Sequence, residues 1–351
     1  MQSNSDPRAE IQIGGQAVIE GVVMRGPEKW ALAVRRPSGD MFVSVNPTTT
    51  LAQRYPGWNR FPVRGIFALA DSLVIGIKSL FISGAISLEE APEAPLRAGV
   101  DKAESNAGAA VAAQPPQAQV GKSGLEADLD AEATRDLPED KHQTMSTAAM
   151  AFAMLMALAL FLGLFIVLPA VIAKSLDRYL TSTIFYNLVE GGIRVAVFIG
   201  YLAVMSFLPD IRRVFMYHGA EHKVVHTYEA GQPLTPESAT RFSTAHMRCG
   251  TAFIMIVLIL SVLVFSLMGR PALWLRIVER LAIIPLVAAF SYEIIRFAGR
   301  YEDSTIMKII MAPGLLLQKL TTKEPDESQL EVAIVALKAA VGKDDALPSE
   351  A

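Results

Sequence analysis

The sequence predicts an α+β membrane protein with a small N-terminal β-rich segment and a helical membrane domain of about four spans. Hydrophobic residues make up 52% of the 351 residues and charged residues only 19%. That balance is more apolar than an average soluble domain. Short alternating runs lie before residue 48, whereas long uncharged apolar stretches lie after residue 147. The first pattern favours strands, and the second favours membrane helices.

The segment 11–88 is predicted to be β-rich and to end in an amphipathic helix. Its runs WALAV and MFVSV flank a Pro-Ser-Gly-Asp turn, which predicts a hairpin. The preceding stretch IGGQAVIEGVVMRGP is rich in glycine, which favours tight turns or a close approach of backbone.

Residues 62–88 have apolar residues at helical spacing and charges at Arg64, Asp71 and Lys78. We expect this helix to lie on a membrane or against other helices, and its charges favour this over a crossing.

Two segments have the composition of disordered chain. Residues 1–10 are a polar tail without the pattern of a signal peptide. Residues 89–145 are rich in alanine, proline, glutamine and acidic residues and poor in aromatics. Such a linker buries too little apolar surface to offset its chain entropy.

The membrane domain is predicted over residues 146–324. Residues 148–173 and 249–269 are uncharged, with 26 and 21 residues, and about 20 apolar residues suffice to cross a bilayer. Weaker candidates are 191–209 and 273–296. The loop 210–248 has five basic residues and the loop 174–189 has two, which places the first in the cytoplasm by the positive-inside rule. Both termini of this multi-pass plasma-membrane protein are then cytoplasmic.

Residues 325–351 are predicted to form a C-terminal amphipathic surface helix and a tail. Asp326 or Ser328 is suited to capping the helix. One face is apolar and consists of Leu330, Ala333, Ile334, Leu337 and Val341.

The stretch YHGAEHKVVHTYE, residues 217–229, indicates a metal site. Four of the five histidines and the single cysteine fall within 32 residues: His218, His222, His226, His246 and Cys249. On a helix, side chains four apart lie on one face, so His218 and His222 can share one metal. HGAEH also matches H-x-x-E-H, in which two histidines bind zinc and the glutamate, here Glu221, is the general base.

The remaining ligands stay open at this point. Imidazole and thiolate both suit zinc, the divalent metal that we expect. A closed site from His218, His222, His246 and Cys249 would be structural, whereas three protein ligands would leave a catalytic site open. His226 is a further donor. Glu293 is another, because a carboxylate near a span is costly unless it has a partner such as Arg296 or the metal.

At these residues the chain resembles the YqhQ family of bacterial membrane proteins. The resemblance lies in six successive blocks: IGGQAVIEGVVMRGP, PVRGIFALADSLVIGIKSL, YHGAEHKVVHTYE, HMRCGTAF, SYEIIRFAGR and APGLLLQKLTTKEPDESQLEVAIVAL. It covers most of the chain outside the termini and the linker. The resemblance implies an integral membrane protein with a metal-dependent site and no established reaction.

Two functions follow from these patterns. The first is a membrane-embedded, metal-dependent hydrolase in which His218 and His222 bind the metal and Glu221 activates water. The second is a non-catalytic scaffold or binding protein with a structural metal site or none. The expected partner is the lipid bilayer, with a homo-oligomer or a membrane-protein partner left open. A net charge of −3 gives no indication of nucleic-acid binding.

Overall fold

The computed structural model describes residues 13–88, 147–269, 271, 273–301 and 304–342. The predicted tail at 1–10 and nearly all of the predicted linker at 89–145 lie outside these residues. The chain divides into two compact units, of which the first comprises residues 1–94 and 165–347 and the second 95–164 and 348–351. All sites below lie in the first unit. In the second unit the described residues are 147–164, most of them in helix α4 (Thr147–Leu162).

The N-terminal segment is a four-stranded antiparallel sheet of order β1-β2-β3-β4. Its strands are β1 (Gly14–Val18), β2 (Gly21–Arg25), β3 (Lys29–Arg35) and β4 (Met41–Pro47). The predicted hairpin is confirmed, because β3 pairs with β4 from Lys29 opposite Pro47 to Arg35 opposite Met41. Gly39 has a φ of 96° in the Pro-Ser-Gly-Asp turn, a conformation that favours glycine.

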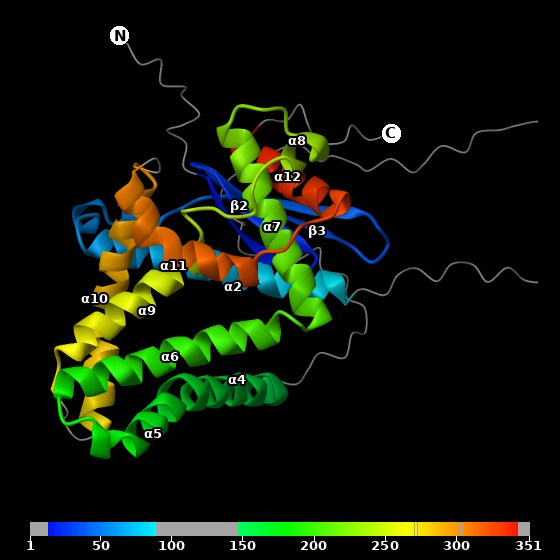
Figure 1. The fold of residues 1–351 in the computed structure, drawn as a ribbon. Helices are drawn as coiled ribbons and strands as arrows, with labels where there is room; N and C mark the ends of the chain where they lie inside the picture. Colours follow the sequence, from blue (N-terminus) through cyan, green and yellow to red (C-terminus); the bar gives the residue numbers. More distant parts are fainter. Residues whose placement is uncertain (1–12, 89–146, 270, 272, 302–303, 343–351) are drawn as a thin grey trace, which may run out of the picture. The chain divides into compact units, whose positions relative to one another are not determined.

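Both faces of the sheet are covered by helices. Successive side chains of a strand point to opposite faces. In β2, Val22 and Met24 therefore pack against α7 (Pro209–Glu229) and α12 (Glu327–Val341), while Val23 lies in the core beside α2 (Val63–Ser87). Figure 1 shows α12, from the end of the chain, lying with α7 against the N-terminal strands.

Helix α12 begins where the sequence predicts, but it is not a surface helix. Asp326 accepts a hydrogen bond from the backbone N–H of Gln329 and completes a capping box, as its position before an apolar run predicts. The prediction of a surface helix is wrong because the residues between the predicted apolar positions are also apolar. Val332, Val335 and Ala336 are buried together with Leu330 and Leu337, as expected of a helix that is hydrophobic on nearly all sides.

The other described elements are helical. They are α1 (Leu51–Arg54), η2 (Pro56–Trp58), the π-helix η3 (Gly163–Val167), α5 (Leu168–Ser175), η4 (Asp177–Tyr179), α6 (Thr183–Met205), α8 (Pro236–Thr240), α9 (Gly250–Ser266), α10 (Leu273–Ala298) and α11 (Thr305–Thr321). Among the described residues, four helices are long and apolar enough to cross a membrane: Val63–Ser87, Leu155–Ser175, Thr183–Met205 and Trp274–Ala298.

The predicted number of about four candidate spans is confirmed, but the set of helices selected by length and composition alone differs from the prediction. The length and composition of α2 place it among the four, although its charges favoured a helix at the surface. The stretch predicted at 249–269 forms the 17-residue α9, which is shorter than the other candidates.

Candidate metal centre

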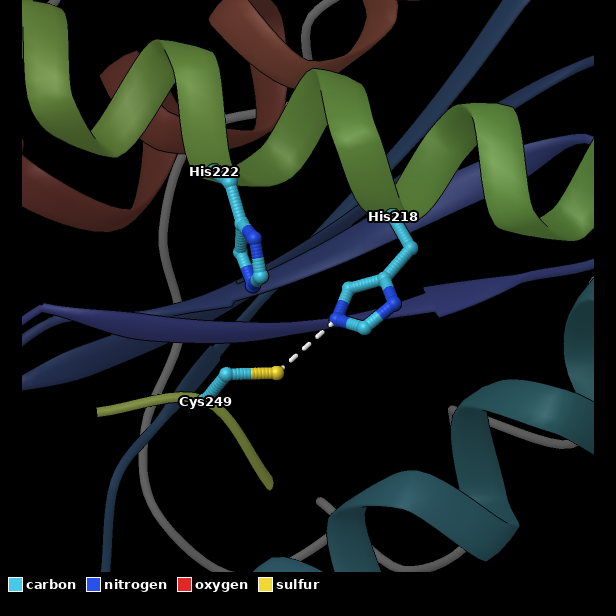
Figure 2. Close-up of side chains that lie close together, drawn as sticks. All are labelled: His218, His222 and Cys249. Carbon is cyan, nitrogen blue, oxygen red and sulfur yellow. Dashed lines mark hydrogen bonds between the residues drawn. The ribbon is translucent and has the colours of Figure 1, made fainter. Parts of the chain in front are cut away.

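Helix α7 carries most of the candidate residues and is fixed against the sheet. Tyr217, Ala220 and Val224 on one side of α7 are fully buried in the core that it shares with β2, β3 and α12. Positions 218 and 222 lie one turn apart on another side. In Figure 2 both side chains reach from α7 toward Cys249, the residue that directly precedes α9.

The structure brings three of the six predicted metal ligands together. One donor atom each from His218, His222 and Cys249 lies within 4.8 Å of the other two. His218 Nε2 is 3.1 Å from Cys249 Sγ, and His222 and Cys249 are buried. Two imidazoles and one thiolate are a donor set that suits zinc.

Backbone carbonyls orient both imidazoles. His218 Nδ1 lies 2.8 Å from the carbonyl oxygen of Thr321, and His222 Nδ1 lies 2.5 Å from that of Thr244. Because a carbonyl only accepts hydrogen bonds, Nδ1 carries the proton in each ring and Nε2 is the nitrogen left for a ligand. A hydrogen bond from Nδ1–H to a carbonyl commonly fixes the tautomer and the ring orientation of histidines that bind metals through Nε2.

Two buried polar atoms of this cluster form no hydrogen bond with the residues that the structure describes. His222 Nε2 and one carboxylate oxygen of Glu221 are shielded from solvent and find no hydrogen-bond partner within the described part of the chain. An unsatisfied buried polar atom costs roughly 1–3 kcal/mol. Such atoms are expected where a ligand completes the site.

The electrostatics of the cluster are dominated by burial and by the His218–Cys249 pair. Burial opposes charge on His218, but Cys249, Glu221 and the carbonyl of Thr321 together raise the pKa of His218 to about 9. Burial likewise opposes a charged Cys249, and the positive charge of His218 nevertheless holds the thiol pKa well below its usual value. Burial raises the pKa of Glu221, with smaller opposing contributions from His222 and His218. The cluster thus favours a thiolate at Cys249.

The second group of donors consists of His226, Glu229 and His246. His246 Nε2 lies 3.6 Å from a carboxylate oxygen of Glu229, and Arg248 forms an ion pair with the same carboxylate. His226 Nε2 donates to the carbonyl of Ala245 at 2.9 Å. Burial, followed by the nearby His246, lowers the pKa of His226 to about 4. Arg248 makes this group less attractive to a cation than the first group.

Glu293, the sixth predicted ligand, lies in neither group. Its carboxylate accepts hydrogen bonds from Nε and Nη2 of Arg64, the former at 2.6 Å, and so links α10 to α2. The predicted need of this carboxylate for a partner is met by Arg64, a residue 229 positions earlier.

A cavity of about 650 Å³ adjoins the first group, with walls formed by β1, β2, α2, α7, α9 and α10. Its polar lining includes His218, Glu221, His222, Cys249 and Arg25. Beside it, β1 runs close to Glu221, because a Cβ placed on Gly15 would lie 3.0 Å from the Glu221 carboxyl carbon and 2.6 Å from the carbonyl oxygen of Val23. Gly15 is therefore one of the glycines that allow a close approach of backbone.

Comparison with known proteins assigns the chain to a family. A family model described as "Protein of unknown function (DUF1385)" matches residues 61–343. "Uncharacterized protein YqhQ" of Bacillus subtilis (strain 168) is 30% identical over 327 residues, which are 92% of this chain and 89% of that protein. The chain belongs to the YqhQ family. No solved structure matches this chain, and neither description names a metal or a reaction for the YqhQ family.

Several residues of this YqhQ-family site have no signal in the sequence. The carbonyls of Thr244 and Thr321 belong to the backbone, which any residue supplies. Gln318 is fully buried and holds the backbone of His246 through two hydrogen bonds of 2.8 Å. Nothing in the block APGLLLQKLTTKE distinguishes Gln318 from the neighbouring polar residues such as Lys319 and Thr321.

Proposed function

We propose that His218, His222 and Cys249 hold a divalent metal, zinc, and that the protein is a metal-dependent hydrolase of the plasma membrane. The observation that carries the proposal is the convergence of one ring nitrogen from each of His218 and His222 and the sulfur of Cys249 within 4.8 Å, beside a cavity lined by Glu221. Membrane helices and membership of the YqhQ family are consistent with it.

The residues fit such a metal. Both Nδ1 atoms are engaged by carbonyls, His222 Nε2 is buried without a hydrogen bond to any described residue, and the surroundings favour a thiolate at Cys249. Three protein ligands are typical of catalytic zinc sites, whereas structural sites usually have four. A bound metal would supply Lewis-acid chemistry, which acidifies water and polarises the bond to be broken.

Glu221 has the place and the character of a general base. Its carboxylate lines the cavity, is buried and keeps one oxygen free of hydrogen bonds to the described residues. Burial raises its pKa, which moves a carboxylate toward the range in which it accepts and returns a proton near neutral pH. Gly15 leaves room for this side chain.

A structural metal is the second candidate. The carbonyls that hold the imidazoles come from the loop after α8 and from the end of α11. A metal on His218, His222 and Cys249 would therefore join α7 to both segments and to the start of α9. A metal with only this role needs no general base, so Glu221 distinguishes the two candidates.

The cytoplasmic face of the membrane is the location that we propose for the centre. The loop 210–248 is the more basic one. It lies on the same body as the N-terminal sheet, because α7 packs against β1 and β2. Both termini would share that side.

The first experiment is elemental analysis of the detergent-purified protein beside the double variant His218→Ala/His222→Ala. His226→Gln is the matched control, because it changes a histidine of α7 outside the first group. Stoichiometric zinc in wild type and control, and loss from a folded double variant, support the site. Absence of metal from all samples after reconstitution with zinc, manganese and iron would overturn it.

The catalytic role is tested with Glu221→Gln. Retained zinc with loss of a hydrolytic activity found in wild type supports the enzyme. Retained zinc with unchanged activity or cellular phenotype would contradict a catalytic Glu221 and favour the structural metal.

A further inference from the structure

Helix α2 has two apolar sides, only one of which is covered. Ile75, Ile82 and Ile86 pack against the sheet. The other side exposes a continuous set of large apolar residues, which are Leu73, Val74, Ile77, Leu80 and Phe81, each at least 46% exposed. An exposed apolar face of this size marks an interaction surface, and in a protein with membrane helices the bilayer is the nearest apolar partner.

Counting membrane crossings shows how α2 meets the bilayer. The sheet and α7 pack against each other, so they lie on the same side and an even number of crossings separates them. Three segments of sufficient length lie between them, namely α2, 155–175 and α6. By sequence, residues 89–146 contain no apolar run long enough for another.

One of the three therefore does not cross, and α2 is the one that contacts strands β1, β2 and β3. A position of α2 along the membrane surface satisfies this count. Helices α7 and α12 also pack together, so an even number of crossings separates them as well. If α10 is one of these crossings, α9 is the other. The 17 residues of α9 are at the short end of the range for a crossing helix.

The cavity extends from the metal ligands to this membrane-facing surface. Besides the histidines, the lining includes an apolar set formed by Leu69 and Leu73 of α2, Phe253 and Ile254 of α9 and Ile295 of α10. Leu73 and Ile254 are also 63% and 43% exposed. The apolar wall therefore continues onto the outer surface of α2 and α9, where the acyl chains of a bilayer would lie.

Arg25 places a cation in the same cavity. Its guanidinium is 4.0 Å from the carboxylate of Asp71, at the limit of an ion pair. Asp71 also accepts hydrogen bonds from the backbone N–H of Leu51. The side chain of Arg25 is 27% exposed, so its guanidinium remains accessible to an anion, and guanidinium groups bind phosphate well.

We propose that the cavity binds a membrane phospholipid that enters sideways from the bilayer. One chain lies along Leu69, Leu73, Phe253 and Ile254, and the phosphate lies toward Arg25. This substrate class rests on the proposed hydrolase function of the same site. Hydrolysis of an ester in such a lipid forms a bond between the oxygen of water and the acyl carbon or phosphorus. The bond from that atom to the leaving oxygen breaks, and the leaving oxygen takes up a proton.

The size of the cavity favours a lipid over a membrane helix. About 650 Å³ is within the range of small-molecule sites. A helix with its side chains is about 10–12 Å across and requires far more room. A lipid also matches the combination of an apolar wall, a single cation and a polar reactive end.

The test uses full-length protein in lipid nanodiscs and a phosphatidylglycerol probe with a photoreactive diazirine in its acyl chain, mapped by mass spectrometry. We expect saturable labelling of the half-buried Leu69, Phe253 or Ile295, distinct from bulk-lipid labelling of Leu80 and Phe81. Leu73→Trp, which narrows the cavity, should lower the saturable labelling about ten-fold. Leu80→Trp is the matched control on the exposed face of α2 and should leave it unchanged.

A diacylglycerol probe with the same chain tests the phosphate. We expect it to label the cavity about ten-fold less at equal concentration, and Arg25→Gln to reduce labelling by the phospholipid probe to a similar extent. Labelling confined to Leu80 and Phe81 would overturn lipid entry, and equal labelling by both probes would overturn recognition of the phosphate.

Metal content measured on the same samples separates this proposal from the proposed function. His218→Ala/His222→Ala should lose the metal but keep the saturable labelling, because neither residue lies on the apolar wall. Bound zinc without cavity labelling would overturn the lipid and leave the metal site standing. Cavity labelling without zinc under any condition would overturn the hydrolase and leave a lipid-binding cavity.

Discussion

His218 Nε2 lies 3.1 Å from the sulfur of Cys249, a residue 31 positions further along the chain. His218 is in the middle of α7, and Cys249 is the N-cap residue of α9, a candidate membrane helix. This contact places the proposed metal at the junction between the sheet-packed helix and the membrane domain. The predictions below test the junction and its surroundings.

Cys249 and His246 should differ in their effect on metal binding. Cys249→Ala removes one of three converging donors, so we expect the zinc dissociation constant to rise on the order of 100-fold or more. His246→Ala is the comparison variant, because His246 lies in the second group beside Glu229, and it should change the constant much less. Competition with a chromogenic chelator measures both. Equal losses would show that His246 is also a ligand.

Glu221→Gln should stabilise the metal-free protein near neutral pH. Burial raises the pKa of Glu221 in the folded state, so stability is fully present below the unfolded pKa of about 4.3 and is lost as pH rises. Glutamine keeps the shape without the charge. Between pH 5 and pH 7, we expect the thermal unfolding midpoint of chelator-treated wild type to fall further than that of chelator-treated Glu221→Gln. A constant difference between the two would contradict this expectation.

The contribution of His226 to the pH dependence of stability should have the opposite sign to that of Glu221. Its pKa is lowered from 6.5 to about 4, so the unfolded chain binds the extra proton between these values and stability is lost as pH falls through this window. The loss is at most about 3 kcal/mol. His226→Gln, which can still donate to the Ala245 carbonyl, should remove this part of the pH dependence in thermal unfolding. A variant with the wild-type profile would assign the effect to another group.

Gly219→Ala should disturb the support of His218. A Cβ at this position would meet the carbonyl oxygen of Lys323 at 2.0 Å, and Thr321, whose carbonyl holds His218, is two residues away. We expect a loss of about 1–3 kcal/mol from overpacking, together with weaker zinc binding. Gly192→Ala is the control, because a Cβ there has no neighbour within 4 Å. Thermal unfolding and zinc titration of both variants provide the measurement.

Glu293→Gln should leave metal binding intact and weaken the contact between α2 and α10. The side chains of Arg64 and Glu293 are 32% and 18% exposed, and such a pair contributes about 1 kcal/mol. A double-variant cycle with Arg64→Gln measures the coupling from unfolding midpoints, and elemental analysis measures the zinc. Loss of zinc in Glu293→Gln alone would restore Glu293 as a metal ligand.

Local features of the fold could be predicted from the sequence. The alternating runs around Pro-Ser-Gly-Asp predict the β3–β4 hairpin, and Asp326 before an apolar run predicts the start of α12. Both depend on neighbouring residues. The burial of α12 depends instead on strands about 300 positions away, so the local pattern favoured a surface helix. The partner of Glu293 is similarly remote in the sequence, so the local pattern favoured the nearby Arg296.

The candidate site could be predicted as a set of residues but not as a geometry. Helical spacing alone places His218 and His222 on one face. Which of His246, Cys249 and Glu293 approaches them depends on the path of the chain between α8 and α9 and on the crossing of α2 with α10. No local pattern specifies either path. The carbonyls of Thr244 and Thr321 leave no trace in a sequence at all.

The position of α12 against β2 and β3 has a consequence for biosynthesis. The sheet leaves the ribosome before the membrane segments, whereas α12, one of the helices that cover it, follows only after them. At about 5–20 residues per second, the strands wait on the order of tens of seconds for that partner while the membrane segments are inserted. The body formed by the sheet, α7 and α12 therefore closes only after α12 has been made, so ribosome stalling before residue 327 would expose the apolar strands to chaperones and proteases.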